Sequence, residues 1–229
     1  MIRQLSTLLI LASAVLAGCA TKPQNPVAMN AAAALKPEVR IGVAMTALPK
    51  ADTFFPGAGC LLCYAAASVA NNSLTGVAHS LPSDELALVK VQMMEAVTKK
   101  GGQAVLIDEA VDLKTFPELA NWEQNRPRRD FSRLRDKYKI DKLLLIQIDS
   151  LGFQRNYSAY IPTSDPRAWV HGAGSLVDLG SQRLEWWQPI DVVKASSGKW
   201  DEPPKYPGLT NAYFQAIELT KDRLLNPLQ

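Results

Sequence analysis

Short apolar runs alternate with amphipathic stretches along the middle of the chain. Three of these runs are typical of strands, namely Val39–Thr46, Ala104–Ile107 and Lys142–Asp149. The third is apolar over enough consecutive residues to predict a central strand that is covered on both faces. Between the runs, apolar residues recur at helical spacing in Ser83–Lys100 and Asp130–Tyr138. The pattern therefore predicts the order strand, helix, strand, helix, strand.

The last third of the chain has a different pattern. Ala168–Asp178 and Arg183–Ile190 flank the turn-like stretch Leu179–Gln182, which predicts an antiparallel hairpin, and a final helix is predicted from Thr210 to Leu224. Alternation followed by a hairpin predicts an α/β fold in a single domain over residues 39–229. We expect a mixed parallel and antiparallel sheet with helices packed against it, ending in a C-terminal hairpin plus helix.

The amino terminus carries a targeting pattern. Arg3 precedes the short apolar run Leu8–Val15, and Leu16–Cys19 reads Leu-Ala-Gly-Cys. This arrangement resembles the lipobox of bacterial lipoproteins, in which the cysteine carries a covalent lipid and a peptidase cuts before it. The resemblance implies a signal peptide over residues 1–18 and a mature chain that begins at a lipidated Cys19.

Two other interpretations of this leader are an ordinary secretory signal peptide, cleaved after Gly18 or Ala20, and an uncleaved membrane anchor. The anchor is disfavoured, because about 20 apolar residues are needed to cross a bilayer and this run is shorter. Ala20 follows the cysteine, whereas an aspartate there is the familiar signal for retention in the inner membrane of enteric bacteria. We therefore expect the protein on the periplasmic face of the cell outer membrane.

Residues 19–38 mix proline, alanine and polar residues without a strand or helix period. This composition is typical of a linker between two better-defined parts of a chain. We predict that the segment is a lipidated, flexible tether between the membrane and the folded domain.

Composition and charge narrow the classes of partner and cofactor. Of the 229 residues, 47% are hydrophobic and 21% are charged, and the formal net charge is +3. That charge is too small to indicate a polyanionic partner, so we expect no binding of nucleic acid. The two histidines, His79 and His171, have no tight spacing to the cysteines, so we expect no metal site. No cofactor is expected apart from the covalent lipid on Cys19.

Residues 53–83 contain no Asp, Glu, Lys or Arg, and the stretch 57–70 is rich in apolar and small side chains. A buried helix or a tightly packed loop is the plainest interpretation. A contact between subunits, or a surface that dips into the membrane, is the alternative, because uncharged small residues allow close packing against another surface.

Cys60 and Cys63 form the one motif of a catalytic kind. Two cysteines of an exported protein are often linked in a disulfide, and we expect a disulfide or two buried thiols here. The alternative is thiol-disulfide exchange, since a C-x-x-C motif at a helix start lowers the pKa of a thiol. The chain has no Gly-x-Ser-x-Gly motif and no phosphate-binding glycine loop. Asp108, Glu109 and Asp112 follow a predicted strand and are interpreted as solvated loop charges, with acid-base chemistry or cation binding as the alternative.

A basic run between residues 126 and 139 is interrupted only by Asp130 and Asp136. Because apolar side chains take the inward face of the predicted helix, its arginines must point outward. We interpret the run as a solvated face or as a contact for anionic lipid, lipopolysaccharide phosphate or an acidic protein. The residues assigned to this anionic-partner contact are Arg126, Arg128, Arg129, Arg133 and Arg135.

Three segments, Pro56–Cys63, Asn156–Pro162 and Trp200–Phe214, resemble a family of uncharacterised proteobacterial outer-membrane lipoproteins. The resemblance covers most of the mature chain and implies no particular activity. More distantly, the element order and the lead Lys139–Lys142 into a strong strand resemble the fold of the curli-secretion lipoprotein, the amino-terminal domain of the Tol propeller protein, and the lipoprotein activators of peptidoglycan synthases. This similarity implies work in envelope assembly by analogy alone.

The sequence therefore predicts a lipid-anchored, periplasm-facing lipoprotein that is not an enzyme and acts as a binding or assembly module. Its partners would be the membrane, through the lipid, and an envelope protein or further copies of itself. One alternative is a thiol-disulfide redox protein that uses Cys60 and Cys63. Another is a subunit of an outer-membrane secretion complex, which would require residues 53–83 to form amphipathic strands.

Overall fold

The first part of the chain mixes short strands with several helices, and the last part is a run of strands followed by one long helix. A computed structural model describes residues 23–120 and 122–229. Its strands are β1 (Arg40–Met45), β2 (Asp52–Phe54), β3 (Gln103–Leu106), β4 (Lys142–Gln154), β5 (Tyr157–Ser158), β6 (Ile161–Pro162), β7 (Arg167–Asp178) and β8 (Arg183–Ala195). Its helices are α2 (Ala31–Ala34), α3 (Leu61–Ala70), α4 (Asn72–Ala78), α5 (Asp84–Ala87), α6 (Val89–Lys99), α7 (Ser132–Tyr138) and α8 (Pro207–Leu225), with the short 3-10 helices η1 (Leu113–Thr115) and η2 (Asn226–Leu228).

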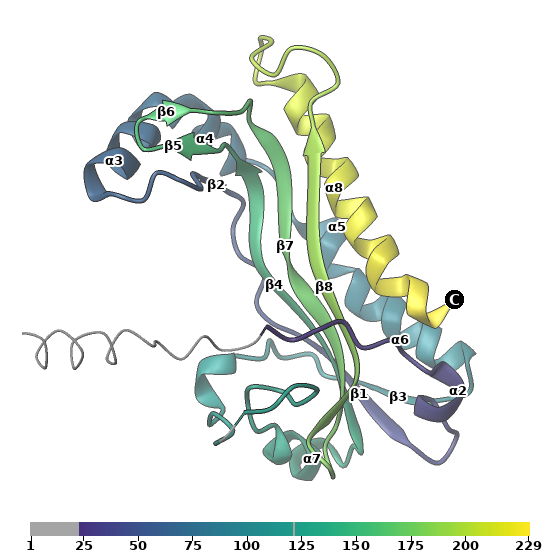
Figure 1. Cartoon of the computed structure of the whole chain (residues 1–229). Coiled ribbons are helices and arrows are strands. Elements are labelled where there is room, and N and C mark those ends of the chain that lie inside the picture. Colours follow the sequence, from purple (N-terminus) through teal and green to yellow (C-terminus); the bar gives the residue numbers. More distant parts are fainter. Residues whose placement is uncertain (1–22, 121) are drawn as a thin grey trace, which may run out of the picture.

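One mixed sheet organises these elements, with the strand order β3-β1-β4-β7-β8 and with β2 paired to the far end of β4 (Figure 1). β1 pairs in parallel with β3 and β4, whereas β4, β7 and β8 pair in antiparallel fashion. The predicted α/β fold with a mixed sheet is therefore confirmed, and so are the hairpin and the C-terminal helix.

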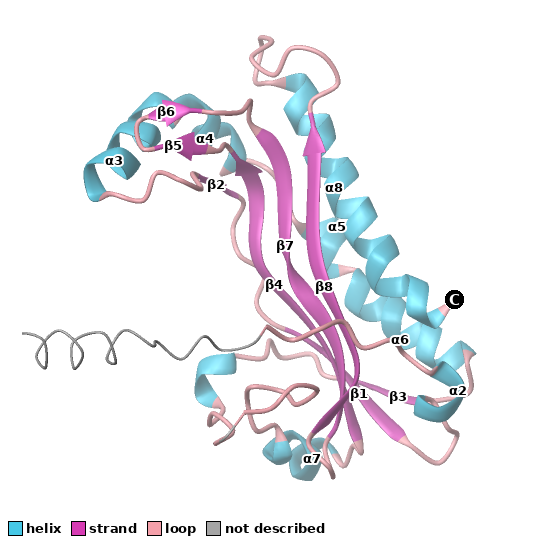
Figure 2. Cartoon of the chain, in the orientation of Figure 1, coloured by secondary structure: helices cyan, strands magenta, loops and turns pink. Residues whose placement is uncertain are grey.

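The two faces of the sheet are covered differently. Helices α5, α6 and α8 lie against one face, as Figure 2 shows, and the main hydrophobic core lies between them and the sheet. On the other face, residues 107–141, which include η1 and α7 and are called the α7 lobe here, cover only the end of the sheet where β4 begins. Within residues 23–120 and 122–229, no helix covers the remainder of that face (Figure 2).

The long strand β4 extends beyond its prediction and bends where it does so. The predicted strand ended at Asp149, whereas β4 continues to Gln154. The pairing with β7 shifts register between Ile148 and Ser150, so Asp149 is the extra residue of a β-bulge. Bulges bend a strand and redirect a side chain, and the side chain of Asp149 points away from the core.

A glycine on β7 allows α8 to approach the sheet. A Cβ atom built on Gly174 would lie 2.3 Å from the Trp186 ring and 2.7 Å from Leu224 of α8. Trp186 is 1% exposed, so its indole has no free space into which it could move. The absence of a side chain at Gly174 is therefore what lets this indole lie over β7 and contact α8.

The described part of the predicted tether, residues 23–38, is packed on the domain instead of being free. Val27 exchanges two backbone hydrogen bonds with Trp187 of the edge strand β8, at 2.9 and 3.0 Å. Ala34 and Leu35 are buried in the main core. The expectation of a flexible tether over 19–38 therefore does not hold for 23–38, because an edge strand offers unpaired backbone groups to any segment that reaches it.

Residues 53–83 are helical in large part, but their first helix is not buried. They form part of β2, then α3 and α4, and α3 projects at the far end of β4 (Figure 1). These elements are helices, whereas the secretion-channel hypothesis requires amphipathic strands here. Among the described residues, no helix is both long and apolar enough to cross a membrane. Cys19 and the predicted signal peptide lie outside the described residues.

We predict that Gly174→Ala lowers the free energy of unfolding by about 1–3 kcal/mol, because the added methyl group must displace the Trp186 ring in a packed core. The measurement is urea unfolding followed by circular dichroism. Gly180→Ala in the β7–β8 turn is the matched control, since a Cβ atom there meets only Asp178 at 3.5 Å. Equal stability of the two variants would contradict this account of how α8 packs.

Candidate functional site

The first candidate site is the projecting end of the molecule, residues 52–80 and 155–164, which we call the head. It contains β2, α3, α4 and the β5–β6 hairpin (Figure 1). A small core of its own holds it together, built from Phe55, Ala58, Cys63, Ala67 and Tyr157. This core is separate from the two clusters that pack on the main sheet.

Buried polar contacts join the two segments of the head. Asn71 is 3% exposed, and its side-chain amide donates to the Ala67 carbonyl and to the Tyr157 hydroxyl, both at 2.7 Å. Arg155, just beyond β4, donates to the Asn71 side-chain oxygen at 3.1 Å. A buried amide with its partners satisfied holds one geometry, because losing a partner would leave a desolvated polar atom. The sequence showed Asn71 only as the end of an apolar run.

The outer surface of the head is apolar and exposed. Seven of the ten positions of α3 are exposed, and all seven are Leu, Tyr, Val or Ala. Leu61 is 85% exposed, Val69 78% and Leu62 70%, and on the neighbouring hairpin Ile161 is 69% exposed. We call α3 together with the β5–β6 turn the apolar surface of the head. An apolar patch of this kind marks a contact with another molecule or a membrane.

Cys60 and Cys63 are joined in a disulfide at the start of α3. Cys60 is the N-cap residue, and its sulfur accepts a hydrogen bond from the backbone N–H of Cys63 at 2.9 Å. The hydroxyl of Tyr160 lies 3.7 Å from the same sulfur. Cys60 is exposed, whereas Cys63 is 4% exposed in the small core. The bridge therefore connects the apolar surface to the interior of the head.

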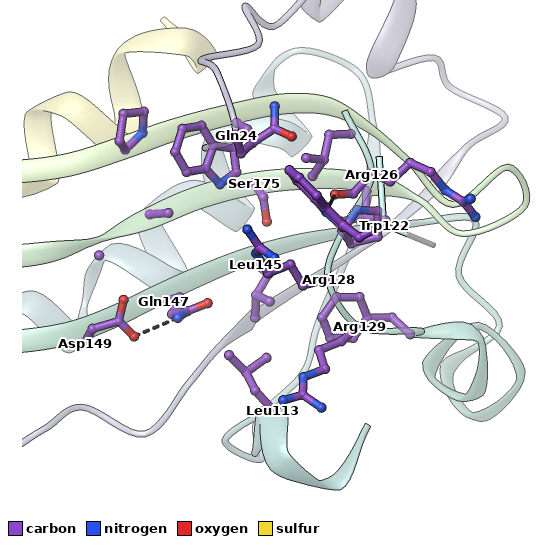
Figure 3. A pocket seen from close by; sticks show the side chains of 18 of the residues that line it. Gln24, Leu113, Trp122, Arg126, Arg128, Arg129, Leu145, Gln147, Asp149 and Ser175 are labelled. Carbon is purple, nitrogen blue, oxygen red and sulfur yellow. Dashed lines mark hydrogen bonds between the residues drawn. The ribbon is translucent and has the colours of Figure 1, made fainter. Parts of the chain in front are cut away.

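The second candidate site is a groove on the uncovered sheet face, at the edge of the α7 lobe (Figure 3). Its volume is about 460 Å³. One wall is formed by the segment 122–129 of the lobe, and its floor is formed by small side chains of β7, among them Ala173 and Ser175. Gln24 from the N-terminal segment completes the rim, where its side chain accepts from the Asn125 backbone N–H at 2.8 Å.

Of the five arginines predicted to contact an anionic partner, the structure brings three together at this groove. Arg128 stacks over the Trp122 ring at 4.2 Å, and Arg129 pairs with Glu118 at 3.0 Å. Arg126 donates to the Gln182 carbonyl oxygen at 3.4 Å. Within the described residues, Arg128 has no carboxylate within ion-pair distance.

Arg133 and Arg135 lie elsewhere, on α7. Arg133 packs over the Phe116 ring at 3.8 Å and lines a different hollow. As predicted, α7 turns its apolar side inward, and Phe131 and Leu134 are each 4% exposed. The five arginines therefore do not form one surface.

Acidic residues neutralise much of the basic run. Residues 107–141 contain eight acidic and eight basic side chains. Hydrogen bonds from Lys137 at 2.6 Å and from Tyr138 hold the pKa of Glu109 below its usual range. Contacts from the side chain and backbone of Ser132 likewise lower the pKa of Asp130. The lobe therefore has no net charge that would attract a polyanion over a long range.

The groove also contains groups that the sequence did not associate with the arginines. Asp149 at the bulge also lines the groove, and its carboxylate accepts from Gln147 at 2.6 Å. His171 lies on β7 with its ring 3.9 Å from Asp191. Among the described residues, no group of three or more His, Cys, Asp or Glu side chains is placed to hold a metal ion.

Comparisons with known proteins assign no family. No protein-family model and no curated protein matches the chain. Among solved structures, the PelC dodecamer from Paraburkholderia phytofirmans is similar, with 13% identity over 90% of this chain and 95% of that chain and a TM-score of 0.35. A homolog of a neuraminyllactose-binding hemagglutinin from Helicobacter pylori shares 11% identity over 91% of this chain and 94% of that chain, with a TM-score of 0.34.

A protein from Xanthomonas campestris is similar over 61% of this chain and 57% of that chain, with 14% identity and a TM-score of 0.32. Similarities this distant determine neither a family nor a function. The resemblance to outer-membrane lipoproteins therefore stays a prediction.

We predict that replacing both Cys60 and Cys63 by serine lowers the free energy of unfolding by only about 2 kcal/mol, because the bridge closes a loop of four residues. Thermal unfolding of the oxidised protein and the variant measures this difference. In intact cells, thiol alkylation should modify neither cysteine until a reductant is added. Partial alkylation without reductant would instead favour thiol-disulfide exchange.

Proposed function

We propose that this protein is a lipid-anchored module on the periplasmic face of the outer membrane, which binds another envelope protein in the groove and catalyses no reaction. The observation that carries the binding role is the groove itself, which is lined by an arginine stacked on a tryptophan and by the carboxylate of a bulged aspartate. The lipid attachment is carried by the sequence Leu-Ala-Gly-Cys at 16–19.

The residues of the groove match those that dominate binding energy in protein interfaces. Tryptophan and arginine are enriched at such positions, because they bury a large area while keeping a polar group available. Trp122 and Trp187 both line the groove, together with Arg128. A shallow floor of Gly172, Ala173 and Ser175 leaves room for an incoming backbone.

The charges of the groove specify the occupant. Arg128 is exposed and ready to pair with a carboxylate, while the carboxylate of Asp149, which accepts from Gln147, has room to accept from a further donor. A polyanion would suit the first group and be repelled by the second. A polypeptide segment that carries an acidic side chain and a nearby basic or amide group suits both.

The side chains of the groove do not assemble a hydrolytic site. His171 and Ser175 both line it, but they lie four positions apart on one strand, which separates them by about 13 Å. A serine nucleophile requires its histidine within hydrogen-bond reach. These residues therefore support binding better than catalysis.

The short length of chain between Cys19 and the groove limits how far the groove can lie from the membrane. Gln24 at the rim is five residues after Cys19, and five residues span at most about 18 Å when fully extended. A lipid on Cys19 would therefore hold the groove close to the bilayer, where other lipid-anchored and membrane proteins present their segments.

We predict that cells grown with labelled palmitate incorporate the label into the protein at Cys19. Cys19→Ser should abolish the incorporation, since the thiol is the attachment point, whereas Cys60→Ser should retain it. Immunoprecipitation followed by detection of the label measures both variants. Label that persists in Cys19→Ser would contradict lipid attachment at this residue.

A photo-reactive amino acid introduced at position 173, on the groove floor, should form a covalent adduct with another protein in intact cells. Arg128→Glu should lower the yield of that adduct about tenfold, because it replaces an attractive pair by a repulsive one. Arg135→Glu on α7 is the charge-matched control and should leave the yield unchanged.

Mass spectrometry of the adduct distinguishes a different envelope protein from a second copy of this chain. An adduct whose yield is the same in all three proteins, or no adduct at all, would contradict the proposed use of the groove.

A further inference from the structure

The apolar surface of the head is exposed around most of the circumference of α3. At 100° per residue, the exposed positions from Tyr64 round to Ala70 cover an arc of about 240°. Only Cys63 and Ala67 on the opposite side reach the small core. The flat face of another folded protein covers one side of a helix, so it would leave much of this arc in water. A fluid apolar medium can surround the whole arc.

The β5–β6 hairpin extends the same surface. Tyr160 and Ile161 are 56% and 69% exposed, and the Tyr160 hydroxyl lies 3.7 Å from the Cys60 sulfur at the start of α3. Tyr64 on α3 is 50% exposed. Leucine, isoleucine and valine suit the acyl region of a bilayer, whereas tyrosine suits its boundary with the headgroups. The composition of the head therefore matches the interfacial layer of a membrane.

Charge and length agree with shallow insertion. Residues 53–83 carry no Asp, Glu, Lys or Arg, and the Asp52–His79 pair lies at the far end of α4 from α3. α3 has ten residues, which makes it about 15 Å long. A helix of that length is too short to span a bilayer, but it can lie within the boundary between headgroups and acyl chains.

The length of chain that precedes the sheet allows the head and the predicted lipid to reach one bilayer. Val27 pairs with Trp187 of β8. Trp187 is opposite Ser175 of β7, which in turn is opposite Leu145 of β4, so Val27 lies at the level of Leu145 along the sheet. β4 continues nine residues from Leu145 to Gln154, about 30 Å, before the head begins. Gln24 is held at the groove rim, and Cys19 precedes it by only five residues, which span at most about 18 Å. Since this reach is shorter than the 30 Å of strand, the lipid and the head contact one bilayer when β4 lies along the membrane surface.

We infer that α3 and the β5–β6 turn insert into the headgroup and acyl boundary of a phospholipid bilayer as a second membrane contact. This inference rests on the lipid attachment of the proposed function, because the lipid supplies the bilayer. The lipid holds the protein at the membrane, and the head then determines which way the uncovered sheet face and its groove are turned. Asn71 joins the end of α3 to the segment that follows β4, through Tyr157 and Arg155, so the inserted helix keeps its position relative to the sheet.

The test uses the lipidated protein in vesicles of phosphatidylethanolamine and phosphatidylglycerol that contain brominated lipids. An environment-sensitive fluorophore is attached to Val69→Cys on α3 or, as the control, to Leu88→Cys between α5 and α6. Both native side chains are exposed, at 78% and 50%. Fluorescence at position 69 should shift to the blue, and the brominated lipids should quench it at least about threefold more strongly than fluorescence at position 88.

A double variant, Leu61→Asn with Leu62→Asn, removes two exposed apolar side chains from the head. Both leucines are exposed, so the fold and the disulfide should survive, which circular dichroism and thiol titration verify. Quenching at position 69 should then fall to the level at position 88. Retained quenching in this variant would overturn the inference.

Two other outcomes would also overturn it. A blue shift at position 69 without quenching by brominated lipids, accompanied by cross-linked dimers, would show that a second copy covers the head. Neither a shift nor quenching would show that the head stays in water. Because palmitate incorporation and the groove adduct are measured separately, failure of the head experiment leaves the proposed function intact.

Discussion

The pairing of β4 with its three neighbours is the constraint on which the rest of the structure depends. β4 pairs with β1 and β7 over its first part, and with β2 and β7 over its last part. Residues 142–146 are buried and lie between the helices of the main core and the α7 lobe. The same strand then carries the head at its far end. A strand in the middle of a sheet must satisfy its backbone groups on both sides, so its neighbours cannot shift without losing hydrogen bonds.

The bulge at Asp149 separates these two roles of β4. Before the bulge, side chains of β4 contribute to the packed cores, and after it Leu151 and Phe153 return to the main core while the chain bends toward the head. A second bulge lies at the other end of the sheet, where Glu185 is the extra residue between β7 and β8 and its carboxylate pairs with the buried Lys142 at 2.5 Å. The two bulged positions of the sheet therefore carry carboxylates that point away from the core, whereas the regularly paired positions supply most of its side chains.

The head and the groove lie at separate places along the same strands. Each leaves side chains in water that are typical of a contact surface. The head leaves leucine, valine and isoleucine side chains exposed, and the groove leaves Arg128 stacked on Trp122 beside an open floor. Apolar exposure of this extent is a risk for aggregation unless something covers it. A protein attached to a bilayer by lipid would have such a cover at all times, and the groove would face a crowded membrane surface.

Local periodicity by itself determined the succession of strands and helices, the hairpin and the last helix, because alternation and helical spacing are properties of neighbouring residues. It also revealed the lipobox-like leader and the adjacent cysteines. Only the tertiary structure decided that α3 is exposed and that two of the five arginines lie outside the groove. It also decided that Gln24 and Val27 pack on segments more than 100 residues away. Exposure and charge pairing depend on which distant segments come together, and no pattern within a short stretch of chain contains that information.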